Sequence, residues 1–188
     1  MTAKYKLIVI GGSAGSLQVI LKLFKNIKQD FKTPFLLVLH RNNTFDSALE
    51  ELLAFKTDLF VKEVEEKEII REGVIYVCPA DYHVLIEKNL SFSFDYSEKV
   101  NFSRPSIDVV FASAADVYKE GLICILLSGA NADGAAGLQQ AKINGGFIIV
   151  QQPADAEVPY MPEKALLRVI PDLILKGKEI AGFINSLA

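Results

Sequence analysis

Residues 6–16 read KLIVIGGSAGS, and this stretch sets the expectation for the whole chain. The short apolar run at residues 6–10 predicts a buried strand. A turn of glycine and serine follows, and a helical pattern then covers residues 17–27. A strand, a tight turn and a helix are the first half of a βαβ unit. The stretch therefore predicts a parallel sheet covered by helices.

The rest of the chain continues this alternation of apolar runs and helical patterns. Strands are expected at residues 35–39, 59–64, 122–127, 147–150 and 173–175, and helices at residues 47–56, 107–119, 135–143, 162–169 and 178–187. Ser47 with Glu50 suggests a capping box for one helix, and Ser106 suggests an N-cap for another.

The middle of the chain departs from the alternation. Short strands are expected at residues 74–77, 84–87 and 91–94, with Lys88 and Asn89 as a turn between the last two. We interpret this section as an antiparallel ribbon. The expected fold class is α/β: a doubly wound, mainly parallel sheet with helices on both faces and an appended antiparallel hairpin, in a single domain over residues 1–188.

Composition narrows the class of protein. The chain has 188 residues, a formal net charge of −3 and no run of Lys or Arg, which argues against nucleic-acid binding. Its N-terminal apolar run is too short for a signal peptide or a membrane span, so we expect a cytoplasmic protein with no membrane insertion. Cys78 and Cys124 lie inside apolar runs and are expected to be buried, reduced thiols. No Cys or His spacing predicts a metal site.

Residues 11–15 match the pattern G-x-S-x-G, with Ser13 between a predicted strand and a predicted helix. Small flanking residues permit the tight turn that exposes a serine hydroxyl, and the helix start can stabilise an oxyanion. Glycine-rich turns also cradle phosphates, although Ser13 and Ser16 replace the second and third glycines of the dinucleotide fingerprint and the Walker lysine is missing. The pattern alone leaves a nucleophile, a phosphate site and a plain tight turn open.

Two further segments place reactive residues at the carboxyl ends of strands, where ligands bind in open parallel sheets. His40 ends the second predicted strand and suits a general base, although a structural histidine is as consistent with that position. Asp133 follows the apolar run at residues 122–127 and can orient an imidazole or cap a helix. The chain has one other histidine, His83, which we interpret as structural.

The chain resembles the catalytic domain of the CheB family, the chemotaxis receptor-glutamate methylesterases. Six ordered stretches carry the resemblance: IVIGGSAGS (8–16), VLHRNNTFDSALEELL (38–53), GVIYVCPADYHVLI (73–86), RPSIDVVFASAA (104–115), LLSGANADGAAGL (126–138) and QQPADAEVPYMPEKAL (151–166). They run over nearly the whole length of the chain.

The resemblance implies a serine hydrolase that removes methyl esters from glutamates on the cytoplasmic helices of chemoreceptors and releases methanol. Some members also deamidate receptor glutamines. By position, the nucleophile falls on Ser13, the base on His40 and the orienting aspartate on Asp133. The amide of Ala14, and the loop around Ala130, are expected as oxyanion donors. The resemblance implies no metal and no organic cofactor.

The chain also departs from the family pattern near the site. Ala14 stands where threonine is usual, and Ala130 and Asn131 replace a Met-Gly pair on the site rim. Arg41 and Asn42 are expected as substrate contacts. No receiver-domain pattern precedes the catalytic pattern, which is consistent with a stand-alone member or with a separate receiver-type regulator. The alternatives are a non-catalytic binding module on the same scaffold and a flavodoxin-like phosphate or nucleotide binder.

Overall fold

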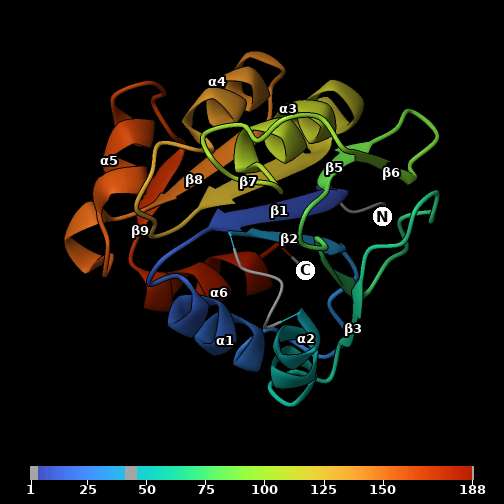
Figure 1. Ribbon diagram of the computed structural model, residues 1–188. Coiled ribbons are helices and arrows are strands. Elements are labelled where there is room, and N and C mark those ends of the chain that lie inside the picture. Colours follow the sequence, from blue (N-terminus) through green and yellow to red (C-terminus); the bar gives the residue numbers. More distant parts are fainter. Residues whose placement is uncertain (1–3, 41–45, 188) are drawn as a thin grey trace.

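A seven-stranded, wholly parallel sheet forms the centre of the molecule, seen edge-on in Figure 1. The structure is a computed structural model that describes residues 4–40 and 46–187. The strand order is β3-β4-β2-β1-β7-β8-β9. The strands are β1 (Leu7–Gly12), β2 (Phe35–Leu39), β3 (Phe60–Glu63), β4 (Val74–Val77), β7 (Leu122–Leu126), β8 (Phe147–Gln151) and β9 (Leu173–Leu175).

Helices cover both faces of this sheet (Figure 1). On one face lie α1 (Leu17–Lys25), α2 (Asp46–Ala54) and α6 (Gly177–Asn185), and on the other α3 (Ile107–Tyr118), α4 (Ala135–Ile143) and α5 (Tyr160–Leu166). Each face has its own apolar core. Leu7 and Val9 of β1 point into one core, and Ile8 and Ile10 into the other. This alternation explains why β1 reads as a continuous apolar run, since both of its faces are buried.

The middle of the chain corrects one expectation. The hairpin of β5 (His83–Ile86) and β6 (Phe92–Asp95) is antiparallel and separate from the main sheet, as the expected fold class requires. However, β4 belongs to the parallel sheet, where it pairs with β2 on one side and β3 on the other. A four-residue apolar run cannot reveal its pairing partners, and the ribbon is therefore one strand smaller than the sequence suggested.

The two predicted helix caps have different outcomes. Ser106 caps α3, since its side chain accepts a hydrogen bond from the Val109 amide at 3.4 Å. The capping box of the preceding helix is wrong, because α2 already begins at Asp46 and Ser47 lies inside it. The Glu50 carboxylate instead accepts a hydrogen bond from the Glu63 amide of β3 at 3.2 Å.

Within residues 4–40 and 46–187, no helix combines the length and the hydropathy that a bilayer crossing requires.

Candidate active site

Ser13 and His40 emerge side by side at the carboxyl edge of the sheet. Their preceding residues, Gly12 and Leu39, are register partners on the neighbouring parallel strands β1 and β2. The His40 amide also donates to the Gly12 carbonyl at 3.3 Å. Because adjacent strands lie about 4.8 Å apart, the register alone brings the serine and the histidine together.

The turn that carries Ser13 is fixed by hydrogen bonds and by a glycine. The Ser13 amide donates to the Ser128 carbonyl at 2.9 Å, and the Ser16 hydroxyl donates to the Ser13 carbonyl at 2.7 Å. Gly15 has φ +79°, and a Cβ there would lie 2.7 Å from Ser128 Oγ. Only glycine fits that conformation and that close approach without strain. The backbone of Ser13 is therefore locked against the loop after β7.

The loop after β7 brings a buried carboxylate to His40. Asp133 Oδ2 lies 2.8 Å from His40 Nε2, and the Asp133 side chain is fully buried whereas that of His40 is 11% exposed. Since a carboxylate only accepts hydrogen bonds, Nε2 carries the hydrogen in this pair. The lone pair of the neutral imidazole is then on Nδ1, which is the atom left to act as a base.

The Asp133 carboxylate collects four more donors from the start of α3 and the segment before it. They are Ile107 N at 2.6 Å, Ser106 Oγ at 2.8 Å, Asp108 N at 3.1 Å and Asn101 Nδ2 at 3.1 Å. Burial by itself raises the pKa of Asp133, but the hydrogen bonds from His40, the two amides and Asn101 outweigh it. The pKa of Asp133 is lowered, and the group is a carboxylate at neutral pH.

This lowered pKa predicts how folding stability depends on pH. Because the pKa of Asp133 is lower in the folded than in the unfolded chain, ionised Asp133 stabilises the fold above about pH 4. That contribution is lost as the pH falls through the folded-state pKa. We expect the free energy of unfolding, measured by urea titration, to fall on acidification below about pH 4. The fall should be shallower in Asp133→Asn than in the exposed control Asp30→Asn, and equal slopes would contradict this role of Asp133.

Some backbone amides near Ser13 remain free to act as donors. The amides of Ser13 and Gly129 already donate, to Ser128 O and to Val158 O at 3.1 Å. Among the described residues, those of Ala14 and Ala130 donate to no protein acceptor. Free amides beside a nucleophile are what an oxyanion hole requires, so the geometry is compatible with the donors expected from the sequence.

A hydrogen-bonded chain through His83 reaches the same carboxylate, and sequence reasoning missed it. The fully buried His83 accepts the Ser106 amide on Nδ1 at 3.2 Å, and its Nε2 bonds the Glu98 carbonyl at 3.0 Å. The hydroxyl of Ser106 in turn donates to Asp133. His83 thus has the structural role that was expected, but it also fixes a residue that holds Asp133.

Replacing His83 by asparagine or by glutamine distinguishes its hydrogen bond with the Ser106 amide from that with the Glu98 carbonyl. Asparagine places an oxygen near the Nδ1 position and keeps the acceptor for Ser106, whereas glutamine keeps only a donor near the Nε2 position. We expect His83→Gln to lower kcat for ester hydrolysis by about tenfold with KM unchanged, the scale of one lost hydrogen bond. His83→Asn should stay within about threefold of the wild type. Steady-state kinetics on a small ester test this, and equal losses in the two variants would assign His83 to folding alone.

The other residues expected at the site are Asn131, Arg41 and Asn42. Asn131 does not face a ligand freely: its Nδ2 donates to the Asn101 carbonyl at 3.1 Å, and its Oδ1 accepts the Asp133 amide at 3.2 Å. It therefore braces the loop that carries Asp133. Arg41 and Asn42 lie outside the described residues.

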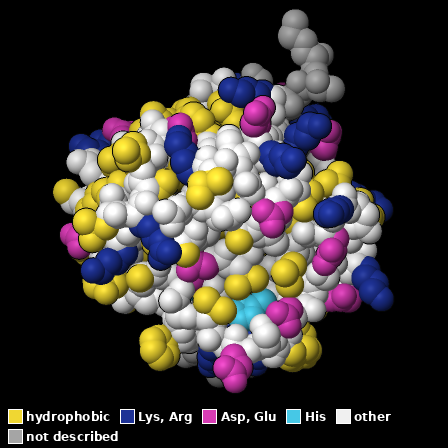
Figure 2. All heavy atoms as spheres, turned by 90° about the horizontal axis from the view of Figure 1, so that it is seen from above, with side chains coloured by type: hydrophobic (Ala, Val, Ile, Leu, Met, Phe, Trp, Pro, Cys, Tyr) yellow, Lys and Arg dark blue, Asp and Glu magenta, His cyan; other side chains and the backbone are white. Residues whose placement is uncertain are grey.

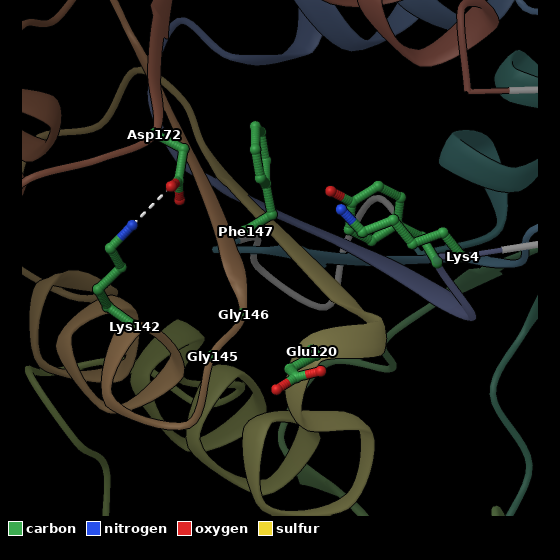
Figure 3. Close-up of a pocket in the computed structure, with 8 residues that line it drawn as sticks. Lys4, Glu120, Lys142, Gly145, Gly146, Phe147 and Asp172 are labelled. Atoms are coloured by element: carbon green, nitrogen blue, oxygen red, sulfur yellow. Dashed lines mark hydrogen bonds and ion pairs between the residues drawn. The ribbon is translucent and has the colours of Figure 1, made fainter.

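A pocket at the opposite edge of the sheet does not belong to this site. It has a volume of about 370 Å³ and is lined by residues at or just before the amino ends of strands, among them Lys4, Glu120, Phe147 and Asp172 (Figure 3). Lys142 points at Asp172 across it, with Nζ and Oδ1 2.6 Å apart. In open parallel sheets, ligands bind at the carboxyl ends of the strands, which is the edge of Ser13 and His40. Nowhere in the described part of the chain do three or more His, Cys, Asp or Glu residues gather as metal ligands.

Comparison with known proteins gives matches over nearly the whole chain. The family model described as CheB methylesterase matches residues 8–184. A protein of Leptospira interrogans, named putative protein-glutamate methylesterase/protein-glutamine glutaminase, is 43% identical over 177 residues, which cover 94% of this chain and 92% of that protein. A protein-glutamate methylesterase/protein-glutamine glutaminase of Thermotoga maritima is 30% identical over 178 residues, 93% of this chain and 52% of that protein. The crystal structure of the Thermotoga maritima CheB methylesterase catalytic domain superposes with a TM-score of 0.93 at 29% identity, covering 98% of this chain and 99% of that one.

Proposed function

This chain belongs to the CheB methylesterase family, and from that premise we propose that it hydrolyses γ-methyl esters of glutamate side chains with Ser13, His40 and Asp133 as its catalytic residues. The observation that carries the proposal is the 2.8 Å contact between His40 Nε2 and Asp133 Oδ2, directly beside the strand end that presents Ser13. A buried carboxylate, an imidazole and a serine in this order are the parts of a hydrolytic triad.

In the first half of the reaction, Ser13 Oγ attacks the ester carbonyl and its proton passes to His40 Nδ1. Asp133 keeps Nε2 protonated and stabilises the imidazolium that forms. The amides of Ala14 and Ala130 stabilise the oxyanion of the tetrahedral intermediate. When the bond to the methoxy group breaks, His40 returns the proton and methanol leaves an acyl-enzyme on Ser13.

In the second half, His40 Nδ1 removes a proton from water, which attacks the acyl carbon. The bond to Ser13 Oγ then breaks, and His40 returns the proton to Ser13. The products are the glutamate carboxyl group, which loses its proton to solvent, and the original enzyme. The residues named here complete the cycle without a metal or cofactor.

The same intermediate connects the ester and amide reactions that the relatives' names pair. Attack on a glutamine carboxamide gives an identical acyl-enzyme, with ammonia leaving in place of methanol. We propose this deamidation as a second activity of the same site. Ammonia release from a receptor fragment with glutamine at the methylation sites, lost together with methanol release in Ser13→Ala, is the expected result.

The alternative functions lack such support. The comparisons favour the methylesterase over a non-catalytic module or a phosphate binder. The turn at residues 11–16 lacks the Walker lysine, and Ser13 and Ser16 stand where the dinucleotide fingerprint has its second and third glycines. These missing residues weigh against a phosphate or nucleotide site at this turn.

We propose chemoreceptors as the substrate proteins. The test is methanol release from a methyl-esterified cytoplasmic chemoreceptor fragment, followed by gas chromatography, with the increase in free glutamate measured by peptide mass spectrometry. One methanol per new glutamate supports the proposal. A folded protein that releases no methanol from such a fragment would contradict it.

A further inference from the structure

A tight turn beside the candidate site holds a phenylalanine in an unfavourable place. Val100 and Ser103 exchange backbone hydrogen bonds at 3.2 and 2.9 Å, which leaves Asn101 and Phe102 as the two turn residues. Both have left-handed backbones, with φ +49° and +64°. Asparagine tolerates this region, but the second position of such a turn favours glycine and disfavours a bulky side chain.

Burial does not offset this strain, because Phe102 is 94% exposed. A side chain that is both conformationally costly and fully solvated adds nothing to the folded state that glycine would not supply better. Strained residues of this kind cluster at functional sites, where the surroundings hold them in place. The observed strain is therefore a reason to ask what Phe102 contacts outside this chain.

The surroundings of the turn are those of the candidate active site. The Asn101 side chain donates to Asp133 Oδ1 at 3.1 Å and to Asp108 Oδ2 at 2.9 Å, and the Asn101 carbonyl accepts from Asn131 Nδ2 at 3.1 Å. These bonds attach the turn to the carboxylate that orients His40. Phe102 is thus held in a fixed place next to the catalytic machinery.

Other exposed apolar side chains lack this connection. Phe55, Leu167 and Ile170 are also largely exposed, at 82%, 81% and 86%. Among the large exposed hydrophobic residues of the described ranges, Phe102 alone is adjacent in sequence to a residue that bonds Asp133. On the face seen in Figure 2, hydrophobic side chains also border the exposed histidine surface. An apolar partner could therefore contact more than one hydrophobic side chain there.

We propose that Phe102 is a specificity-determining residue that packs against the polypeptide on either side of the scissile glutamate. The inference rests on the proposed function, since the relatives' names describe a glutamate within a protein as the reacting group. A rigid, exposed aromatic ring is the kind of side chain that dominates protein contacts, because little conformational freedom is lost when it binds. Aliphatic side chains that flank the glutamate are its partners. A small ester carries no such flank and does not reach the ring.

The test compares Phe102→Gly and Phe102→Ala with the wild type and with Phe55→Ala, which changes another largely exposed phenylalanine, just after α2. Each protein is assayed on a methyl-esterified chemoreceptor fragment and on p-nitrophenyl acetate. We expect both Phe102 variants to lose on the order of tenfold in kcat/KM on the fragment, mainly through KM, with the small ester within twofold. Phe102→Gly should also melt at a higher temperature than the wild type, because glycine relieves the left-handed backbone. Phe55→Ala should change neither activity.

Any other outcome of this experiment would reject either the recognition role of Phe102 or the proposed function. Wild-type kcat/KM on the fragment in both Phe102 variants would overturn the recognition role alone. Equal losses on the fragment and on p-nitrophenyl acetate would also overturn it, because the turn would then serve the catalytic geometry. A wild-type protein that releases no methanol from the fragment would overturn the proposed function, and this inference with it.

Discussion

Replacing Ser13 by alanine should lower kcat for ester hydrolysis by between about 10⁴-fold and 10⁶-fold, the loss typical of an enzyme deprived of its serine nucleophile. The alanine side chain has no atom that can attack the carbonyl or form the acyl-enzyme. Folding should be unaffected, because the hydrogen bonds of residue 13 to Ser128 and Ser16 use its backbone atoms. We expect the melting temperature of Ser13→Ala to lie within about 2 °C of the wild-type value, as for a neutral substitution.

Ser16 supplies the matched control for this experiment. It lies three residues away, is 1% exposed, and uses its hydroxyl for a 2.7 Å hydrogen bond to the Ser13 carbonyl. Ser16→Ala should lower the melting temperature but keep kcat within about tenfold of the wild type, the scale of one lost hydrogen bond. A Ser13→Ala protein with more than about 1% of wild-type kcat would place the nucleophile elsewhere.

The second large effect is expected for Asp133→Asn, which should damage both catalysis and stability. Loss of the negative charge removes the group that fixes the His40 tautomer and stabilises its cation, and kcat should fall by about 10³-fold to 10⁴-fold. The five donors directed at Asp133 also require two acceptor oxygens. An asparagine offers one oxygen and turns an NH₂ group toward donors. We expect the free energy of unfolding to fall by about 2–4 kcal/mol at pH 7.

Asp172→Asn is the control that separates the effect on catalysis from the effect on stability. Asp172 accepts hydrogen bonds from Lys142 at 2.6 Å and from the Ile148 amide at 2.8 Å, at the amino edge of the sheet. Its replacement should lower the free energy of unfolding by about 1 kcal/mol and leave kcat unchanged. Kinetics at saturating substrate and urea denaturation at pH 7 give both quantities. Wild-type kcat in Asp133→Asn would show that His40 needs no carboxylate partner.

The adjacent positions of Ser13 and His40 at the sheet edge could be predicted because they depend on local features. Each residue follows an apolar run, and parallel strands bring their carboxyl ends to one edge of the sheet. Asp133 follows the buried strand β7, which pairs with the other side of β1, so the same rule placed it near. The fold class followed from the alternation of strands and helices, which is also local.

The residues that hold Asp133 could not be predicted in this way. Asn101 and Ser106 bond Asp133 directly, and His83 acts on it only through Ser106. Hydrophobic periodicity in the sequence does not predict such long-range side-chain contacts. Only Ser106 carried a signal, as an N-cap, and the structure shows that its hydroxyl serves both the cap and Asp133. For a related reason, the sequence placed β4 in the antiparallel ribbon, whereas it pairs within the parallel sheet. A short apolar run does not encode its pairing partner.

The most direct test of the account is covalent labelling with a fluorophosphonate, which reacts with activated serine hydroxyls, followed by mass spectrometry of the peptides. The account predicts one adduct per chain, on the peptide that contains Ser13, with loss of ester hydrolysis in proportion to labelling. The adduct should be absent in Ser13→Ala and should form far more slowly in His40→Ala. An adduct on another serine that abolishes hydrolysis, or hydrolysis that persists in the fully labelled protein, would contradict the assignment of Ser13 as the nucleophile.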